Sequence, residues 1–430
     1  MSAATVLIVE PHATGHRGVW LRWISEQLVK HDWRIVIATL AESLQRPALA
    51  WLTQRSAAID VVAVDKHGVY NSGGGLGMLL AAELQCYRVL KRLCLEARRS
   101  HFVDAVLLPY GDYAAHLTPL LGSPFGTLPW IPIVMRQTFH YRSMGVTAPR
   151  PPLSALRRAL FRSFVQTRSL ATCLTIDQPL YEFMRADPQV AHKIGYLADP
   201  VDAIGSTGRN EARARVGIPT DAVVVLIYGT LTSKKGLQYL LPAIRTLRRT
   251  NLHVLCVGVP DAEFRSLLSG SDANILMQAG RLHLIDRWAD GATEVLAFTA
   301  ADIVWLGYVG HWQSSGVLVQ AGRAQLPSIA CDAGIIGWTT VRHQCGLVVP
   351  VREREVVGAA LEVLAASPAL RANLGRNGSR AFAAHTADNA GAIISNALRD
   401  AVTRVPPELR PASTSEAGVP TADFPLRWNR

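Results

Sequence analysis

The sequence lacks the short motifs that identify a metal site, a disulfide framework or a membrane span. Its six cysteines form no Cys-x-x-Cys pair, and most lie in apolar runs, which is typical of buried free thiols in a reducing compartment. The sequence contains no Asp-x-Asp pair and no His-Glu-x-x-His signature, so we expect neither a catalytic metal ion nor a cofactor. No run approaches the roughly 18 apolar residues that a spanning helix needs.

Charged and aromatic side chains are also scarce. Charged residues make up 18% of the 430 residues and hydrophobic residues 49%, which excludes a largely disordered chain. Acidic side chains are outnumbered, and the formal net charge of +11 indicates an anionic partner. Charge alone leaves nucleic acid, a nucleotide-linked substrate and an acidic membrane surface open. Because aromatic residues are only 7% and do not alternate with basic ones in short motifs, we expect no nucleic acid partner.

The chain length and the alternation of strands and helices predict two α/β domains. A chain of 430 residues exceeds what one hydrophobic core usually supports. Short apolar strands such as 6–9 and 223–228 alternate with helical segments, which is typical of a parallel sheet covered on both faces. A break rich in Pro and Asp near residue 200 separates two such series. We therefore predict two doubly wound Rossmann-like domains facing a central cleft, over residues 1–197 and 198–403, followed by a Pro/Ser-rich tail at 404–430.

Two glycine turns in the second series are candidate phosphate sites. The strand 223–228 runs into a turn that places Lys235 at the start of a helix, and Ser314–Gly316 opens another helix after a strand and a loop. Free N–H groups at a helix start and a lysine ammonium both bind phosphate. Each turn alone also fits a plainer alternative, which is a solvated surface lysine for the first and a serine cap for the second.

Together the two turns resemble those of the GT-B glycosyltransferases, specifically the retaining glycosyltransferase family 4. Gly229, Lys235 and Gly236 match in register the family's segment of glycine-arginine followed by lysine-glycine. The run 192–202 is similar to the family's interdomain hinge, and 326–330 is similar to the strand entry after its second turn. The resemblance covers most of residues 1–390. It implies an acceptor-binding first domain and a nucleotide-sugar-binding second domain.

The sequence departs from this family at residues that hold the donor. The family arginine is replaced by Thr230, and the two glutamates of the Glu-x7-Glu motif fall on Trp312 and Gln320. The family's second glutamate binds the donor ribose, and the Gln320 amide would hydrogen-bond the same hydroxyls more weakly than a charged acceptor does. Gln313 is a candidate substitute contact to the sugar. These departures keep a non-catalytic partner subunit with the GT-B fold open as an alternative.

The resemblance assigns roles to residues in each domain. His140, in the segment after the strand 131–135, is similar to the family histidine near the transferred sugar, so we predict His140 and Lys235 as catalytic residues. A surface histidine is the plainer alternative for both His140 and His16. The acceptor-side candidates are Gly15, His16, Arg17, Asp112 and Arg136, and the donor-side candidates are Gly229, Thr230, Lys235, Gly236, Arg281, Gln313, Ser314, Ser315, Gly316, Val317 and Gln320. Arg281 is included because we expect the loop after a strand that ends near 278–281 to recognise the nucleotide base.

The expected activity is that of a metal-independent hexosyltransferase (EC 2.4). The resemblance implies transfer with retention, in which a phosphate oxygen of the nucleotide-sugar donor helps to remove the acceptor proton. Lys235 and the turn amides would stabilise the leaving diphosphate. The acceptor would be a polysaccharide, a glycolipid or a natural-product intermediate. An epimerase or phosphorylase of the same fold and a basic nucleic-acid-binding protein are less favoured alternatives.

A basic amphipathic segment at 156–168 is the candidate for membrane contact. Arg157, Arg158, Arg162 and Arg168 are interleaved there with apolar residues, a pattern of helices that lie on anionic lipid. A core-facing helix with a solvated basic face explains the same pattern. We expect a cytoplasmic protein, with the inner face of the membrane as a peripheral location where lipid-linked acceptors would be reached.

Overall fold

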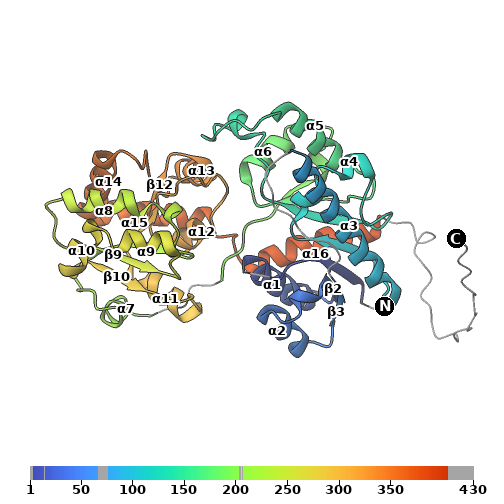
Figure 1. The fold of residues 1–430 in the computed structure, drawn as a ribbon, viewed down its shortest axis with the longest axis horizontal. Helices are drawn as coiled ribbons and strands as arrows, with labels where there is room; N and C mark the ends of the chain where they lie inside the picture. Colours follow the sequence, from blue (N-terminus) through green and yellow to red (C-terminus); the bar gives the residue numbers. More distant parts are fainter. Residues whose placement is uncertain (1–2, 14, 66–75, 203–204, 206, 405–430) are drawn as a thin grey trace, which may run out of the picture.

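The computed structural model describes residues 3–13, 15–65, 76–202, 205 and 207–404. Within these residues the chain forms two lobes, each built on a parallel sheet with packed helices (Figure 1). The predicted tail lies outside the described residues, except for Arg404. None of the helices that are described combines the length and the apolar character needed to cross a membrane.

The first sheet has seven strands in the order β3-β2-β1-β4-β5-β6-β7, all paired in parallel. Separate apolar clusters cover its two faces, with Leu7 in one and Ile8 in the other, which is why β1 reads as an unbroken apolar run. The strands are β1 (Thr5–Val9), β2 (Arg34–Leu40), β3 (Ile59–Val64), β4 (Ala105–Leu108), β5 (Trp130–Val134), β6 (Cys173–Thr175) and β7 (Ile194–Tyr196). The helices are α1 (His16–Lys30), α2 (Pro47–Arg55), α3 (Leu76–Ser100), α4 (Thr118–Leu121), α5 (Ser154–Val165) and α6 (Gln178–Arg185).

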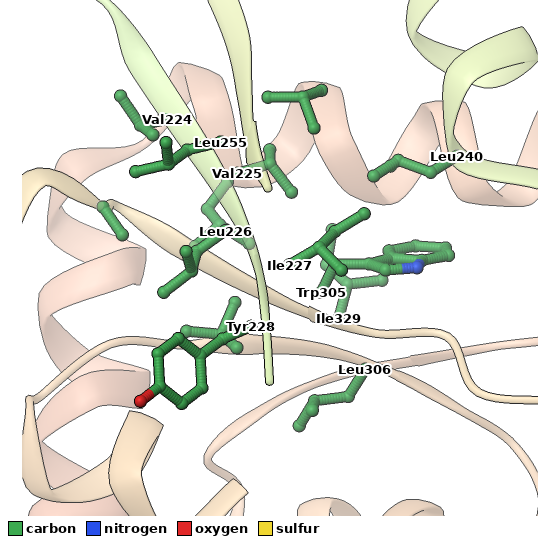
Figure 2. Packing of buried hydrophobic residues seen from close by; sticks show 14 of the residues in the cluster. Val224, Val225, Leu226, Ile227, Tyr228, Leu240, Leu255, Trp305, Leu306 and Ile329 are labelled. Carbon is green, nitrogen blue, oxygen red and sulfur yellow. The ribbon is translucent and has the colours of Figure 1, made fainter. Parts of the chain in front are cut away.

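The second sheet has six parallel strands in the order β10-β9-β8-β11-β12-β13. All six residues of the central strand β8 are buried. Figure 2 shows Val224–Tyr228 in one apolar cluster with Leu240, Trp305 and Ile329. The strands are β8 (Val223–Tyr228), β9 (Leu252–Val257), β10 (Leu282–Ile285), β11 (Ile303–Leu306), β12 (Ser328–Cys331) and β13 (Gly346–Val349). The helices are α7 (Arg209–Arg215), α8 (Leu237–Thr246), α9 (Ala262–Leu268), α10 (Ser271–Gln278), α11 (Gly291–Ala300), α12 (Gly316–Arg323), α13 (Gly334–His343), α14 (Arg354–Ala366), α15 (Pro368–Ala381) and α16 (Ala387–Thr403).

The carboxyl edges of the two sheets face each other across a cavity of about 230 Å³. The first domain contributes residues that follow β6 and β7, among them Gln178 and Asp199, and the second contributes residues that follow β11 and β12, among them Ser315 and Ile336. The strand order reverses between β1 and β4 in the first sheet and between β8 and β11 in the second. The prediction of an α/β protein with two doubly wound domains around a central cleft is confirmed.

The last helix, α16, returns to the first domain. Its residues Ile394 and Leu398 lie in the apolar cluster that contains Ile24 of α1, and the Trp33 indole donates a hydrogen bond of 2.9 Å to the Ser395 hydroxyl. Figure 1 shows α16 in the lobe of the first sheet, beside α1. The predicted extent of the second domain, 198–403, is therefore wrong for this helix. An amphipathic pattern shows which face is buried and not which domain covers it.

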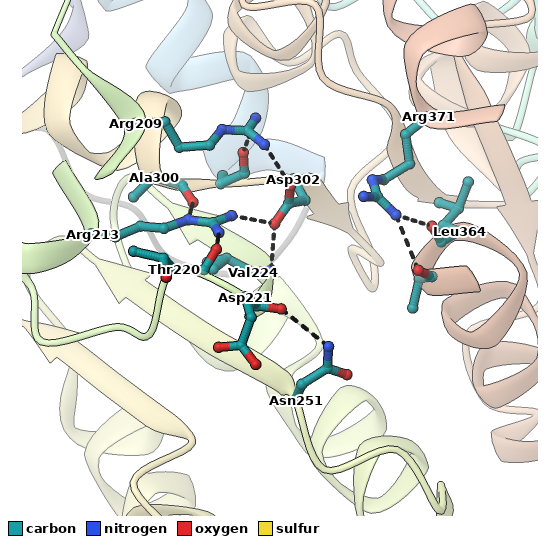
Figure 3. A network of polar contacts seen from close by, with 12 residues as sticks. Arg209, Arg213, Thr220, Asp221, Val224, Asn251, Ala300, Asp302, Leu364 and Arg371 are labelled. Carbon is teal, nitrogen blue, oxygen red and sulfur yellow. Dashed lines mark hydrogen bonds and ion pairs between the residues drawn. The ribbon is translucent and has the colours of Figure 1, made fainter. Parts of the chain in front are cut away.

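A buried ion-pair network fixes the opposite, amino edge of the second sheet (Figure 3). The Asp302 carboxylate, just before β11, accepts hydrogen bonds from Arg209 at 2.8 Å and from Arg213 at 2.6 Å. It also accepts one from the Val224 backbone N–H of β8 at 2.8 Å. Because both charges of the Arg213–Asp302 pair are buried, removing one partner would leave the other uncompensated. The network ties α7 to the two central strands and leaves their carboxyl ends to the site.

Candidate active site at the facing sheet edges

The Lys235 ammonium lies at the point where the second sheet reverses its strand order. Its Nζ donates to the Tyr228 carbonyl oxygen at the end of β8, at 2.9 Å, and to the Tyr308 hydroxyl after β11, at 2.6 Å. The same Nζ lies 4.2 Å from the centroid of the Tyr308 ring. Ligands of open parallel sheets bind in this crevice, beyond the carboxyl ends of the strands. A fixed positive charge at that place suits an anionic ligand.

Close backbone approaches shape the turn that carries this lysine. Gly229 and Gly236 both have positive φ, at 96° and 74°, conformations that L side chains rarely adopt. A Cβ atom on Gly236 would overlap the carbonyl oxygen of Gly307, so the turn packs directly against the loop after β11. Thr230, which stands at the position of the family arginine, is exposed.

The second predicted turn lies close to the first. Ser315 has extended backbone at the N-cap of α12, and among the described residues its side chain makes no capping hydrogen bond, unlike the serine cap of the plainer alternative. His311 connects the turns, because its ring contacts the Tyr308 ring at 5.7 Å and its Nε2 lies 3.2 Å from the Ser314 carbonyl oxygen. Burial lowers the pKa of His311, and the charge of Lys235 lowers it further. The start of α12 and the Lys235 ammonium therefore border one region.

A carboxylate from another helix lies beside Gln320, where the sequence motif has lost its own glutamate. Glu294 of α11 accepts a hydrogen bond of 2.8 Å from the Gln320 amide and one of 2.7 Å from the Tyr228 hydroxyl. Burial raises the pKa of Glu294. Gln320 therefore positions the Glu294 carboxylate and does not itself supply a carboxylate. Sequence reasoning missed Glu294 because the motif predicts carboxylates on α12 itself, and nothing in the sequence of α11 marks it.

The other donor-side candidates differ in their placement. Gln313, Gly316 and Val317 are partly exposed around the start of α12, next to Ser314 and Ser315, which line the interdomain cavity. Arg281 lies at the other edge of the sheet, where its guanidinium donates to the backbone carbonyls of Leu252 and Arg249 at 2.9 and 3.1 Å. The prediction for Arg281 is therefore wrong. The segment before it ends helix α10 and not a strand, so Arg281 precedes β10 instead of following a strand.

Residues after β1, β4 and β5 form a charged cluster at the carboxyl edge of the first sheet. The Arg17 guanidinium lies 3.3 Å from Oε1 of the buried Glu10 and donates to the Tyr113 hydroxyl at 2.5 Å. Arg136 donates to the same hydroxyl at 3.5 Å. Two acceptor-side candidates, Arg17 and Arg136, are thus brought together. Sequence reasoning missed Glu10 because it reads as the end of an apolar strand.

Asp112 and the first glycine turn have more local roles in the described structure. The Asp112 carboxylate accepts hydrogen bonds from the Met135 and Arg136 backbone N–H groups at 2.9 and 3.1 Å and from the Gln137 amide at 2.9 Å, which ties the loop after β4 to β5. Burial raises the pKa of Asp112. Gly15 caps α1 with φ of 53°. The side chain of His16 lies outside what is described.

His140 is fully buried and not exposed to the cleft. Its Nε2 lies 3.3 Å from Asp177 Oδ2, and its ring packs between Phe139, Tyr141 and Phe183. A side chain without exposed surface cannot touch a sugar in this conformation, so the structure contradicts the predicted contact. The prediction that His140 faces the cleft failed because its partner, Asp177, lies far from it in the sequence, near the end of the first domain.

Asp199 is a further candidate that the sequence did not mark as a functional residue. It lines the interdomain cavity together with Ser314 and Ser315, and burial raises its pKa to about 7. The neighbouring His385 contacts the Asp199 carbonyl oxygen through Nδ1 at 2.9 Å, and burial lowers the pKa of that histidine to about 4. Strongly shifted groups in a cleft are functional candidates. Within the described residues, no group of three or more His, Cys, Asp or Glu side chains is placed to hold a metal ion.

Comparison with known proteins adds one relative in sequence. No family model matches the chain. The D-inositol 3-phosphate glycosyltransferase of Streptomyces avermitilis is 28% identical over 209 residues. The match covers 46% of this chain and 44% of the relative, so the chain spans less than half the length of this curated relative.

Solved structures share the fold over most of the chain. Sucrose-phosphate synthase from Thermosynechococcus elongatus has a TM-score of 0.65 at 14% identity, over 94% of this chain and 100% of that one. HepE from Anabaena, in complex with UDP-glucose, has a TM-score of 0.60 at 13% identity, over 93% and 100%. At such identities the likeness shows the fold. The predicted GT-B fold is confirmed.

Proposed function

We propose that the protein is a glycosyltransferase that takes its sugar from a nucleotide-sugar donor bound at the carboxyl edge of the second sheet. The observation that carries the proposal is the Lys235 ammonium, held by Tyr228 and Tyr308 at the strand reversal and linked through His311 to the start of α12. A lysine charge and free helix N–H groups around one region suit a diphosphate. The glycosyltransferase relative and the UDP-glucose complex of HepE support this class of activity and donor.

The transfer step needs negative charge to be stabilised on the leaving diphosphate. The acceptor oxygen bonds to the anomeric carbon as the bond from that carbon to the diphosphate oxygen breaks, and the acceptor proton passes to a donor phosphate oxygen. Lys235 and the α12 N–H groups would carry the electrostatic stabilisation in place of a metal ion. We include retention of the anomeric configuration in this proposal because the sequence resembles a retaining family.

Glu294 would hold the donor ribose. Its two oxygens are fixed by Gln320 and Tyr228 on the same edge of the sheet as Lys235, and a carboxylate is a strong acceptor for hydroxyl groups. This placement would compensate for the glutamate that Gln320 replaces. The ribose and the diphosphate would then be held by side chains and backbone of the second domain alone.

The lysine pair at 234 and 235 provides the test. Lys234 is exposed, whereas Lys235 is half-buried at the strand reversal. We expect Lys235→Ala to lower donor turnover by about a hundredfold, as the loss of a group that stabilises a developing anion does. Lys234→Ala should keep nearly full turnover. A sugar-nucleotide panel assayed for hydrolysis and transfer, with thermal shift by UDP, GDP, ADP and dTDP, makes the measurement. Equal turnover in both variants would contradict the role of Lys235.

A non-catalytic partner subunit is the second candidate. It is favoured by Trp312 and Gln320 at the places of the two family glutamates and by Thr230 at the place of the arginine. The same panel separates the two functions, because a partner subunit would show no nucleotide-induced shift and no turnover.

We also propose that α5 contacts an anionic membrane surface, where a lipid-linked acceptor would be reached. Leu153, just before the helix, and Leu156 on it are 70% and 52% exposed, and Leu120 on the contacting helix α4 is 71% exposed. The exposed Arg158 adds positive charge to this surface. Exposed leucines next to arginines favour binding to anionic lipid. We expect cosedimentation with vesicles containing phosphatidylglycerol at low salt and its loss in Leu153→Asp/Leu156→Asp, and failure of the wild-type protein to sediment would end this part of the proposal.

A further inference from the structure

The interdomain cavity lies where the chain crosses between the two domains. One crossing follows β7, and the chain crosses back between α15 and α16 (Figure 1). The crossings contact each other, because the Val201 backbone N–H donates to the His385 carbonyl oxygen at 3.4 Å and His385 Nδ1 lies 2.9 Å from the Asp199 carbonyl oxygen. Asp199 and His385 both line the cavity, which also reaches Ser315 at the start of α12. The function proposed above assigns no ligand to the part of the cavity beside the crossings.

The Asp199 carboxyl group is buried without a partner. The residue is 7% exposed, and among the described residues no donor or cation contacts its carboxyl oxygens. Glu10 and Asp302 are buried to a similar degree, and each is paired with an arginine. An ionised group buried without a counter-ion is costly. A ligand that brings a positive charge into the cavity would remove this cost.

Aromatic rings line the cavity together with this carboxyl group. The rings of Tyr181 and Tyr196 are 5.7 Å apart, the ring of His385 lies 6.3 Å from that of Tyr196, and Phe382 lies 5.1 Å from His385. Burial raises the pKa of Tyr196, and the charge of Asp199 raises it further, which places the carboxyl group near this ring. Aromatic faces attract cations and are used to bind quaternary ammonium groups. The alkyl groups of such a cation can also lie against apolar surface, unlike the water shell of a metal ion.

The charges of the wall disfavour an anionic ligand. The described residues that line the cavity include two acidic side chains, Asp199 and Glu182, and neither a lysine nor an arginine. Burial lowers the pKa values of both lining histidines, His343 and His385, so these rings add no positive charge near neutral pH. Glu182 already accepts a hydrogen bond of 2.9 Å from the Gln178 amide. Asp199 therefore carries the unbalanced charge.

Positive groups near the cavity belong to the second domain and are weaker. The start of α12 carries the partial positive charge of a helix N-terminus. Arg342 lies 3.7 Å from Glu182 with its side chain 58% exposed, and Arg323 is half-buried behind His385. Charges that reach solvent are screened, whereas a buried charge is not. The remaining polar groups of the wall are neutral and can accept hydrogen bonds from a bound ammonium or hydroxyl group, and they are the hydroxyl groups of Tyr181, Tyr196, Ser314, Ser315 and Thr339 and the amide of Gln178.

We propose that this cavity binds a small organic cation with alkyl groups on its nitrogen, whose charge pairs with the Asp199 carboxylate and whose alkyl groups lie against the rings of Tyr181 and Tyr196. The volume of about 230 Å³ is below the roughly 300–1,000 Å³ of pockets for drug-sized ligands, which suits a cation of few atoms. Because both domains contribute to the wall, such a ligand would stabilise the domain arrangement that forms the cavity. The inference does not depend on the proposed glycosyltransferase function.

Choline and its uncharged carbon isostere, 3,3-dimethyl-1-butanol, are the probes, because they differ in charge and hardly in shape. Isothermal titration calorimetry of the wild-type protein at pH 8, where most Asp199 carboxyl groups are ionised, makes the comparison. Sodium chloride keeps the ionic strength constant along the choline chloride titration. We expect choline to bind at least about tenfold more tightly than the alcohol, a difference of about 1.4 kcal/mol.

Two pairs of variants test the residues. Asp199→Asn keeps the size of the side chain and removes its charge, so choline should bind about tenfold more weakly, whereas the exposed Asp202→Asn should bind it as the wild-type protein does. Tyr181→Leu removes a ring from the wall and should weaken choline by about threefold or more. Tyr239→Leu, at a half-buried tyrosine of α8 that does not line the cavity, should leave the affinity unchanged.

Three results would overturn the proposal: no choline binding by the wild-type protein, equal affinities for choline and the alcohol, or equal choline affinities of Asp199→Asn and Asp202→Asn. Equal affinities of Tyr181→Leu and Tyr239→Leu would overturn its aromatic part. The UDP-induced thermal shift of the same proteins reports on the donor site separately. An absent choline site with an intact UDP response leaves the proposed function standing, and choline binding without a UDP response supports the cation site on a protein that is not a transferase.

Discussion

At the scale of single residues, two buried carboxyl groups make the stability of the protein depend on pH. Burial raises the pKa of Glu10 and of Asp199 to about 7, from ordinary values near 4. Between those values the folded state holds more protons than the unfolded state. The free energy of unfolding therefore decreases as the pH rises from about 4 through about 7, because ionisation without solvent is costly.

The Asp199→Asn variant should remove one of these contributions. Its amide carries no charge, so we expect the Tm of the variant relative to that of the wild-type protein to increase as the pH rises from 5 to 8. Each unit by which the pKa is raised corresponds to about 1.4 kcal/mol of differential stability. Differential scanning fluorimetry from pH 5 to 8 makes the measurement, with the exposed Asp202→Asn as the control. Parallel Tm profiles for wild-type and Asp199→Asn would contradict the buried, protonated state of this group.

The candidate residues whose placement could be predicted from the sequence are those whose position follows from local structure. Lys235 and Ser315 lie on short turns between a strand and a helix, and the local geometry of such turns does not depend on the rest of the fold. Glu294 could not be predicted, because its placement beside Gln320 depends on the packing of α11 against α12 and β8. His140 was assigned wrongly for the same reason, since a distant carboxylate buries and pairs it.

At the scale of elements, burial decides which strands could be predicted. β8 is buried along all six residues and reads as an apolar run, and it was predicted with its observed bounds. In β10 only Leu282 is buried, because this strand lies at the sheet edge, and its pattern is too weak to identify. Because β10 was not recognised, Arg281 was predicted to follow a strand, whereas it precedes one. The position of a short edge strand in the sequence thus decides whether a neighbouring residue lies at the amino or at the carboxyl edge of the sheet.

The turn between β8 and α8 provides a prediction at this scale. Gly236 and Gly280 both have positive φ, at 74° and 65°, so alanine costs about 1–2 kcal/mol at either position. A Cβ atom at Gly236 also overlaps the Gly307 carbonyl oxygen, whereas no described atom lies within 4 Å of one at Gly280. We expect Gly236→Ala to lose more free energy of unfolding in urea than Gly280→Ala, and to lose the UDP-induced shift that Gly280→Ala keeps. Equal losses in the two variants would show that the close approach is unimportant.

At the scale of the whole molecule, the two domains meet at a small seam besides the cleft. The loop after β5 reaches the second domain, where the Tyr141 hydroxyl donates to the Trp312 carbonyl oxygen at 3.1 Å. The Trp338 indole donates in return to the Met144 carbonyl oxygen at 2.8 Å. Tyr141 and Val146 form an apolar cluster with Ile335 across the same seam. Helix α13 also reaches α6 of the first domain, where His343 Nε2 lies 3.2 Å from Gln178 Oε1. Interfaces between domains of one chain permit relative domain motion unless they are large and apolar.

Removing the two side-chain donors of the seam should therefore open the molecule without disturbing the donor site. Tyr141→Phe/Trp338→Phe keeps an aromatic ring at each position and removes two hydrogen bonds, each of which contributes about 1 kcal/mol. A total of about 2 kcal/mol changes the ratio of closed to open forms by about thirtyfold. We expect a larger radius of gyration in small-angle X-ray scattering and slower sugar transfer, because transfer requires groups from both domains. UDP affinity should stay within about twofold of the wild-type value, a change of about 0.4 kcal/mol, since the proposed donor contacts all belong to the second domain. Trp288→Phe, at a tryptophan that is 67% exposed in the second domain, is the control and should change neither quantity. A matching loss of UDP affinity in the double variant would mean that the donor site is completed across the seam, and the division of labour between the two sheet edges would then be wrong.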